Sequence, residues 1–438
     1  MNGDGNRKSD IATPLCIAGC FAVVALLFIT REVCDFFFAG YVSQNLKHYM
    51  EFGRQAAAGL IPYRDFPVEY PPLGALWFWL LAPFSGSESS YNGAFITGMS
   101  VFMLFGLIGT LRLADMLFPD MKPAARRVAA TAAYTVCIVA AGPVCMVSLD
   151  YIPMALSAWA LAVLLRKKHA AAFALLAVAT ASKGYPAVML PVFIFYSLRT
   201  GKTRGCLAGL AAFALVTAAV FAPPFLFARP ELIDAFRYHS SRGIEIGSTY
   251  GAALLSLQFA GLETAVEFGH GSWNVIAGEA SLWCSRLSLP VMLFLLLRAY
   301  SRLIDFAQCA APDESEQACA RRIVSISGLA VAAFMLGFKV GSPQFLCWLI
   351  PVIAPLATGW RGLPRVALFC AAGIAAQWVY PWHMQTVVNG HNPFAVAVLA
   401  SKSLLLILIY ADLRLVSTSK RPAMLRRHLQ EPPAGKSV

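Results

Sequence analysis

Charged residues are scarce in this 438-residue sequence: Asp, Glu, Lys and Arg together make up only 13% of it, against about 25% in soluble domains. Hydrophobic residues reach 58%, and the mean hydropathy is +0.63. This balance excludes a water-soluble enzyme and a disordered chain. Several apolar runs approach or reach the roughly 20 residues that a spanning helix needs, so the sequence predicts a polytopic helical membrane protein. A membrane β-barrel would show short alternating segments instead.

Sequence motifs for metal binding and for phosphate binding by a glycine-rich loop are also missing. The sequence has no Cys-x-x-Cys pair, no His-x-x-x-His or other metal spacing, and no glycine-rich loop of the kind that cradles phosphates. Its eleven cysteines are scattered, most of them in apolar blocks, which is typical of small buried residues. No metal site and no cofactor are predicted, although a need for a divalent metal stays open. The net charge of +12 comes from Lys and Arg in short loops, which favours the positive-inside rule over nucleic-acid binding.

Twelve apolar blocks follow one another along the chain, and they predict an all-α bundle of roughly 11 to 13 transmembrane helices in contact with membrane lipids. Two blocks depart from a simple span. Block 72–85 is too short and predicts a re-entrant or partial helix. Block 170–198 is broken by Lys183-Gly184-Tyr185-Pro186, which predicts two half-helices that meet inside the membrane. The blocks are 12–30, 72–85, 92–117, 126–146, 151–165, 170–198, 205–228, 273–298, 323–340, 343–358, 364–381 and 394–413.

The basic loops predict the orientation of the chain. If Lys and Arg mark the cytoplasmic side, the N-terminus and a basic tail at 414–438 lie in the cytoplasm. Residues 1–413 then form one membrane domain with two large extracytoplasmic loops, 31–71 and 229–272. No cytoplasmic segment is large enough to bind a nucleotide, so any chemistry is expected on the extracytoplasmic face.

Carboxylates stand at two places near the predicted outer surface. The string Gly-Leu-Ile-Pro-Tyr-Arg-Asp-Phe-Pro-Val-Glu-Tyr-Pro-Pro-Leu puts Arg64, Asp65 and Glu69 just before Pro71-Pro72, where the chain re-enters the membrane. The simplest structural interpretation of this string is a surface turn with an internal Arg–Asp ion pair. Asp150, in Ser-Leu-Asp-Tyr-Ile-Pro, precedes an apolar helix and suits a helix cap.

Basic residues accompany these carboxylates inside or beside the predicted spans. Lys183 sits in the broken block, where a buried lysine costs roughly 2.5–3.5 kcal/mol and needs a polar neighbourhood. In Tyr-His239-Ser-Ser-Arg242-Gly, the arginine fork and the histidine suit a phosphate, although a solvated interfacial helix is the alternative. Lys339 opens Lys-Val-Gly-Ser-Pro-Gln-Phe between two spans, and Lys402 lies about 12 Å deep in the last span.

These motifs, in this order, resemble glycosyltransferase family 87, whose members are multi-pass enzymes of the GT-C type. The resemblance extends from about residue 44 to residue 413. It implies a GT-C-like fold and transfer of a hexose or pentose, mannose among the candidates, from a polyprenyl-phosphate donor. The acceptor would be a glycolipid or cell-envelope glycan, the site extracytoplasmic, and the membrane the plasma (bacterial inner) membrane. The implied reaction is a single inverting displacement.

The resemblance also implies roles for individual residues. The family's usual catalytic aspartate falls where this chain has Asn45, in Asn-Leu-Lys-His-Tyr, so another acid must take the proton. Asp65 is placed first because Arg64 should keep it ionised, and the other candidates are Glu69, Asp150 and Asp35. The resemblance assigns donor-phosphate binding to Arg242, His239, Lys183, Lys339 and Lys402, and substrate binding to Arg64, Tyr63, Tyr70, Gln344 and Asn45.

Two other functions fit part of the pattern. Broken helices and intramembrane lysines also occur in transporters, so a flippase of lipid-linked sugars is one alternative. Against it, the two halves of the sequence show no internal repeat. The other alternative is a pseudoenzyme that binds polyprenyl phosphate but lost its base at Asn45.

Overall fold

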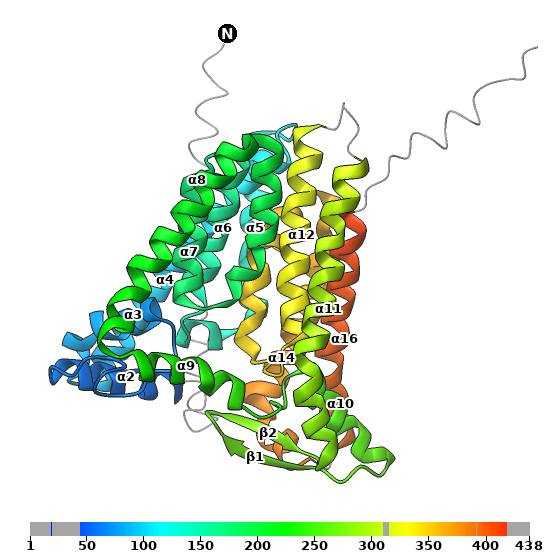
Figure 1. Ribbon diagram of the computed structural model, residues 1–438. Helices are drawn as coiled ribbons and strands as arrows, with labels where there is room; N and C mark the ends of the chain where they lie inside the picture. Colours follow the sequence, from blue (N-terminus) through cyan, green and yellow to red (C-terminus); the bar gives the residue numbers. More distant parts are fainter. Residues whose placement is uncertain (1–18, 20–43, 310–314, 391, 418–438) are drawn as a thin grey trace, which may run out of the picture.

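The structure is a computed structural model that describes residues 19, 44–309, 315–390 and 392–417. In this part of the chain, almost all regular structure is helical (Figure 1). The α-helices are α2 (Gln44–Ala57), α3 (Pro72–Leu80), α4 (Glu88–Leu117), α5 (Pro123–Ala141), α6 (Tyr151–Leu165), α7 (His169–Ser182), α8 (Leu190–Phe227), α9 (Arg229–Ser241), α10 (Thr249–Leu257), α11 (Glu279–Cys309), α12 (Glu316–Gly337), α13 (Ile350–Leu356), α14 (Leu363–Gln377), α15 (Met384–Val388) and α16 (Pro393–Ser417).

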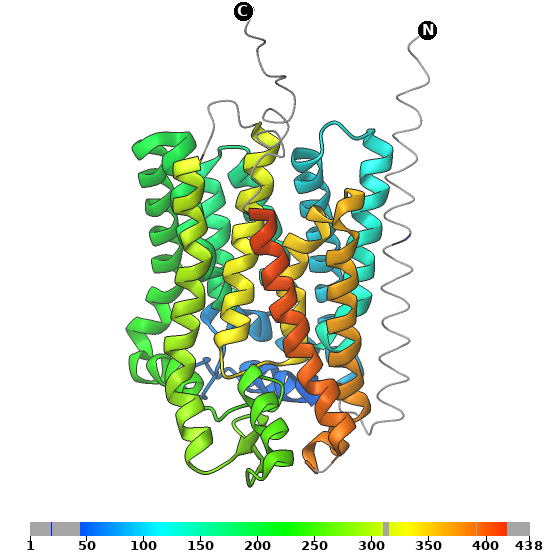
Figure 2. The same ribbon diagram turned by 90° about the vertical axis from the view of Figure 1, so that its right-hand side faces the viewer.

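Seven helical stretches among the described residues are long and apolar enough to cross a membrane, and three shorter apolar helices accompany them. The predicted all-α, multi-span fold class is therefore confirmed. The block 12–30 lies almost entirely outside the described residues. Exposed leucines on the outer helices, such as Leu215, Leu297 and Leu404, match a surface that faces lipid. Figure 2 shows α16 between α12 and α14, and it packs against both.

The broken block folds as its sequence predicts. The first half-helix is α7, whose 14 residues are about 21 Å long and end at Lys183, where the backbone turns extended. After a short 3-10 segment, η3 (Tyr185–Met189), the first part of α8 runs back against α7. A kink at Lys202, with φ of 54°, then separates this returning half-helix from a full span. Prolines and a missing helical turn around residues 183–186 cause the reversal.

Two other irregular segments meet the break at Lys183. They are the short 3-10 helices η2 (Pro143–Val147) and η5 (Pro343–Leu349), and each begins with a proline. Tyr185 of η3 stacks on Trp348 of η5, with ring centroids 4.1 Å apart, and η2 packs against η5. Three breaks in the helical pattern therefore lie together inside the bundle, which is where non-helical backbone is tolerated at membrane depth.

The region 229–276 adds detail to one sequence prediction and corrects another. Loop 229–272 contains α9, α10 and a strand, β1 (Ala265–Gly269), which pairs antiparallel with β2 (Ser272–Ile276). Block 273–298 was expected to be one helix, but its first residues form β2 and α11 begins only at Glu279. Alternating apolar residues favour the strands, and the turn at His270-Gly271 takes positive φ at both residues.

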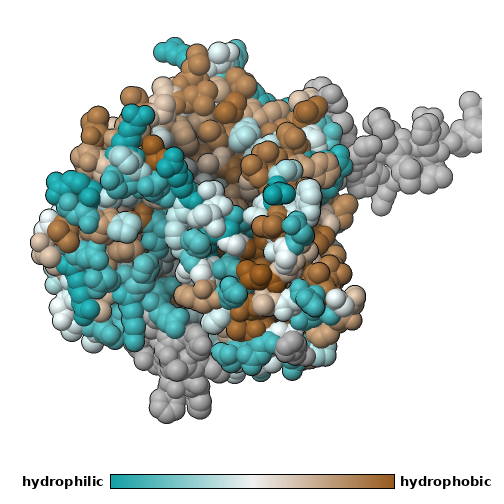
Figure 3. All heavy atoms as spheres, turned by 60° about the horizontal axis from the view of Figure 1, so that its bottom comes forward, coloured by the Kyte–Doolittle hydropathy of each residue, from teal (hydrophilic) through white to brown (hydrophobic). Residues whose placement is uncertain are grey.

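One end of the bundle carries α2, α9, α10 and the β1–β2 hairpin, and we call it the hairpin end (Figure 1). The loops between α4 and α5 and between α6 and α7, which contain Lys122 and Arg166 to Lys168, lie at the opposite end. α3 (Pro72–Leu80) is too short to span, as predicted, and packs against α2 at the hairpin end. Figure 3 shows this end, where hydrophilic side chains cover a broad area and hydrophobic side chains border it.

Candidate active site

A buried ion pair joins the three helix breaks. Both oxygens of Asp150 accept hydrogen bonds from Nζ of Lys183, at 2.7 and 2.8 Å, and Oδ1 also accepts one from Nε1 of Trp348 at 2.5 Å. The Asp150 side chain is fully buried, whereas that of Lys183 is 19% exposed. The pairing offsets the cost of both charges in a low-dielectric interior. It also occupies both oxygens of Asp150, which leaves this carboxylate poorly placed to accept a substrate proton.

The ammonium of Lys183 also lies near two aromatic rings. Nζ lies 5.1 Å from the ring centroid of Phe345 and 5.5 Å from that of Trp348. Its charge reaches His239, because Lys183 is one of the groups that lower the pKa of this histidine. The arrangement holds a mostly buried ammonium group that is paired with Asp150 and acts on His239.

Arg242 has unused hydrogen-bonding capacity at this end. It directly follows α9, and its Nε is buried without a hydrogen-bond partner among the described residues. The described residues also give its guanidinium no ion-pair partner. Buried polar groups are normally satisfied, so a guanidinium left in this state is suited to an anion that supplies several oxygens.

Three further groups lie within electrostatic reach of Arg242. Burial lowers the pKa of Lys339, and the charge of Arg242 lowers it further. Nζ of Lys339 donates to the carbonyl of Ser240 at 2.7 Å, which fixes the ammonium beside the end of α9. The charge of Arg242 also acts on Tyr70 and Tyr238, whose hydroxyl groups keep raised pKa values chiefly because of burial. Both tyrosines therefore stay neutral and can donate hydrogen bonds.

His239 is a neutral member of this group. Burial lowers its pKa below the ordinary value, and the charges of Arg242 and Lys183 act in the same direction. The hydrogen bond to a carbonyl oxygen opposes this shift without cancelling it. That bond joins Nε2 of His239 to the backbone oxygen of Glu69 at 2.9 Å, which assigns the proton to Nε2 and leaves Nδ1 as an acceptor.

Glu69 brings a carboxylate to the same place. Its Oε1 is 2.9 Å from Nε2 of His48, and in the described part of the chain its Oε2 accepts no hydrogen bond. The next residue, Tyr70, shares a 2.9 Å hydrogen bond with the hydroxyl of Tyr49 and receives one on its backbone oxygen from Tyr63 at 2.6 Å. Glu69 thus has one occupied oxygen and one available oxygen beside the basic residues.

Asp65 has a different setting. Arg64 donates to both of its oxygens, at 2.9 and 2.8 Å, and the backbone N–H of Ile61 donates to Oδ2 at 2.8 Å. The hydrogen bond from Arg64, and then that from Ile61, hold the pKa of Asp65 below its ordinary value. It stays ionised, as expected, but a lowered pKa also makes it a weaker base. Arg64 and Asp65 complete an exposed turn that includes Tyr63 at a φ of 69°.

Lys402 is buried in a separate set of polar contacts. Its Nζ donates to the backbone oxygens of Gly247 and Gly341, at 2.6 and 2.7 Å. The nearby carboxylate of Glu245 accepts hydrogen bonds from the N–H of Gly341 at 2.6 Å and from the hydroxyl of Ser342 at 3.0 Å. These contacts tie the loop after α9 to the loop after α12, and they use the ammonium group within the protein.

The remaining predicted residues lie at the margins. Asn45 is near the start of α2, one helical turn before Tyr49, and Gln344 lies in η5 next to the buried Phe345. Asp35 falls outside the described residues. Among those residues, no group of three or more His, Cys, Asp or Glu side chains is arranged to hold a metal ion. The sequence reasoning missed His48, which occurs in the string Asn-Leu-Lys-His-Tyr, and Glu245, which follows the string around His239 and Arg242 by two residues.

Comparison with known proteins identifies the family. The model of glycosyltransferase family 87 matches residues 68–311, more than half of the chain, and this range includes Glu69, Asp150, Lys183 and Arg242. The chain therefore belongs to glycosyltransferase family 87 and is a multi-pass membrane glycosyltransferase of that family. No curated protein matches the sequence.

Two solved structures of ArnT from Cupriavidus metallidurans are distantly similar. The structure bound to undecaprenyl phosphate has 13% sequence identity and a TM-score of 0.47, and the match covers 92% of this chain and 76% of that one. The apo structure has 16% identity and a TM-score of 0.46, with 93% and 76% covered.

Proposed function

We propose that this protein transfers a hexose or pentose from a polyprenyl-phosphate donor to a glycolipid or cell-envelope glycan. The observation that carries the proposal is Arg242, whose buried Nε has no partner among the described residues. The charge of Arg242 acts on Lys339, and both Arg242 and Lys183 act on His239. Such a group of cations at the hairpin end of a membrane protein favours a phosphate that is attached to a lipid. The donor phosphate would bind between these three side chains.

The same geometry supports an extracytoplasmic site. Loops that contain Lys122 and Arg166 to Lys168 lie at the opposite end of the bundle, which the positive-inside rule assigns to the cytoplasm. The hairpin end then faces outward, in the plasma membrane of the cell. A lipid-linked donor suits this side because it carries its own activated sugar in the membrane.

Glu69 is our choice for the base, ahead of Asp65 and Asp150. Its Oε2 accepts no hydrogen bond from the described residues, and its neighbours His239 and Tyr70 lie within electrostatic reach of Arg242. The carboxylates of the other two are already bonded, Asp65 to Arg64 and Asp150 to Lys183. In the proposed step, Glu69 takes the proton of an acceptor hydroxyl as the acceptor oxygen bonds to the anomeric carbon. The bond from that carbon to the phosphate oxygen breaks with its electron pair, and the sugar inverts.

The leaving group is polyprenyl phosphate, which gains negative charge as the bond breaks. Arg242, Lys339 and Lys183 would stabilise that charge, in a setting where preorganised donors act more strongly than they do in water. Asp150 would hold Lys183 in position. Lys402 is left out of this step because its ammonium is bound to two backbone carbonyls.

A transfer assay tests the proposal directly. The purified protein in liposomes receives polyprenyl-phosphate sugars, with acceptor lipids chosen from the glycolipid profile of a deletion strain. We expect a glycolipid product and release of polyprenyl phosphate. Glu69→Gln should lower the rate by about 10²–10⁴-fold, the usual range for general-base assistance. Asp65→Asn is the matched control and should stay near the wild-type rate.

The two alternatives predict other results. A flippase of lipid-linked sugars would move the donor across the bilayer without Glu69 and release no polyprenyl phosphate. A pseudoenzyme weakened at Asn45 would gain at least roughly tenfold from Asn45→Asp. Transport that survives Glu69→Gln, or a rate restored only by an aspartate at position 45, would overturn the assignment of Glu69 as base.

A further inference from the structure

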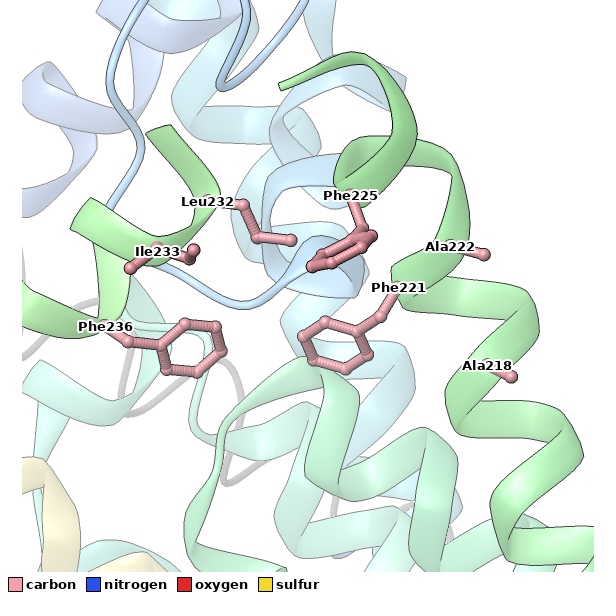
Figure 4. A pocket seen from close by; sticks show the side chains of 7 residues that line it. All are labelled: Ala218, Phe221, Ala222, Phe225, Leu232, Ile233 and Phe236. Atoms are coloured by element: carbon pink, nitrogen blue, oxygen red, sulfur yellow. The ribbon is translucent and has the colours of Figure 1, made fainter. Parts of the chain in front are cut away.

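Helix α9, which Arg242 directly follows, has little buried surface of its own. Phe221 and Phe225 of α8 point toward Leu232 and Phe236 of α9 (Figure 4), and an apolar groove of about 340 Å³ remains between the two helices. Leu232 is the only buried residue of α9, all of which belongs to the described part of the chain. The position of Arg242 therefore depends on contacts near and beyond the end of this helix.

The segment after Arg242 is hydrogen-bonded on both of its edges. On one edge, residues 244–246 form two backbone hydrogen bonds with Val275 and Trp273 of β2, at 2.8 and 3.0 Å, and pair antiparallel with that strand. On the other edge, the N–H of the middle residue donates to the backbone oxygen of Lys339 at 3.0 Å. The hairpin therefore fixes one side of the backbone just after Arg242.

Asn274 of β2 joins the turn of the hairpin to this segment. Its Nδ2 donates to the backbone oxygens of Gly269 and Ser272, at 2.8 and 3.0 Å, so the amide closes the turn. The same side chain packs on Gly243, where an added Cβ would lie 3.0 Å from Cβ and Cγ of Asn274. One buried side chain, only 6% exposed, thus connects the turn to the residue that follows Arg242.

The turn of the hairpin also contacts α9. The ring of His270 lies edge-on to that of Tyr238, with centroids 5.6 Å apart. Tyr238 is about one helical turn before Arg242, and Figure 1 shows the hairpin beside this end of α9. The hairpin therefore contacts the chain both before and after Arg242, whose buried Nε keeps no partner among the described residues.

We propose that the β1–β2 hairpin, through Asn274, positions Arg242 for the donor phosphate. This inference rests on the proposed function, since it takes Arg242 as the phosphate-binding residue. Asn274 is a positioning residue: it acts through the backbone from which the guanidinium extends, and not on the donor itself. A guanidinium fork binds phosphate oxygens with a defined geometry, so a shift of this backbone weakens its contribution to transfer.

A double-mutant cycle tests this role. The value of kcat/KM for a polyprenyl-phosphate sugar is measured for the wild type, Asn274→Ala, Arg242→Ala and the double variant. We expect Asn274→Ala to lower kcat/KM about tenfold and Arg242→Ala to lower it about 100-fold. The double variant should match Arg242→Ala alone, because Asn274 then has no guanidinium to position. Glu267→Ala, at the exposed position opposite Asn274 on β1, is the matched control and should keep the wild-type value.

A second variant approaches the same contact from the other side. Gly243→Ala places a methyl group against Asn274, and it should also lower kcat/KM in the wild-type background but not in the Arg242→Ala background. An equal loss in both backgrounds would mean that the hairpin only stabilises the fold, and the inference would be wrong. Wild-type kcat/KM in both single variants would also overturn it. If the wild-type protein transfers no sugar from polyprenyl phosphate, the proposed function itself fails.

Discussion

Two basic residues near the hairpin end, the buried Lys402 and the partly exposed Arg242, differ in how their hydrogen-bonding groups are used. Lys402 donates to the carbonyls of Gly247 and Gly341 and lies close to the carboxylate of Glu245. Arg242 has a buried Nε with no partner in the described part of the chain. The first residue is satisfied within the folded protein, and the second is not.

This difference separates a structural cation from a binding cation. Removing Lys402 would leave the carbonyl oxygens of Gly247 and Gly341 without their donor, and the buried carboxylate of Glu245 without a nearby positive charge, at a cost to folding. Removing Arg242 would leave no comparable group unsatisfied, because no described neighbour depends on a hydrogen bond from its guanidinium. Sequence alone treats both as candidates for the donor phosphate, and only their surroundings distinguish them.

The largest expected effect is on folding. Lys402→Met should lower the free energy of unfolding by about 1–3 kcal/mol for each of the two buried carbonyl oxygens that lose their donor, and Glu245 also loses its nearby positive charge. Thermal denaturation in detergent measures this. The double variant with Glu245→Gln should recover part of the loss. A Lys402→Met protein with wild-type stability and no activity would instead make Lys402 a substrate-binding residue and would break the comparison.

Arg242→Ala should lower the transfer rate by about 100-fold, which corresponds to roughly 2.7 kcal/mol of lost transition-state stabilisation. Its melting temperature should stay close to that of the wild type. Arg242→Lys should fall between the two, since lysine supplies a point charge without the planar fork. Equal activity of the Lys and Ala variants would show that the fork geometry is irrelevant.

His48→Asn sharpens the assignment of Glu69. A hydrogen bond to a charged group is worth about 1.5 kcal/mol or more, so its loss should cost roughly tenfold in kcat with little change in KM. Lys47→Ala, at an exposed neighbouring position on α2, serves as the control. If His48→Asn has no effect while Glu69→Gln is inactive, Glu69 needs no partner to orient it.

The smallest effect concerns pH. His239 has a pKa below 6.5 in the folded protein, so the unfolded chain takes up a proton there before the folded one does. Folded stability should therefore fall as the pH drops from neutral through about 6.5 and below. His239→Gln should lose less stability over the same interval. A variant with the same pH dependence as the wild type would mean that His239 does not contribute to it.

Much of this molecule follows from its sequence because membrane spans leave a strong hydropathy signal. The break at Lys183 and the short α3 were predicted from prolines and block length. The β1–β2 hairpin was missed because its alternating pattern covers only a few residues on each strand. At the site, residue types and order indicated phosphate chemistry, but the choice between Asp65 and Glu69 depended on contacts that join residues far apart in the chain, such as Glu69 with His239.

The most direct test of the central claim is binding of sugar-free polyprenyl phosphate to the purified protein. Binding only to the folded state raises the melting temperature as the ligand exceeds its Kd. We predict a clear, concentration-dependent increase for the wild type and for Asp65→Asn, and none for Arg242→Ala over the same range. An Arg242→Ala protein that is stabilised as much as the wild type would contradict the assignment of Arg242 to the donor phosphate.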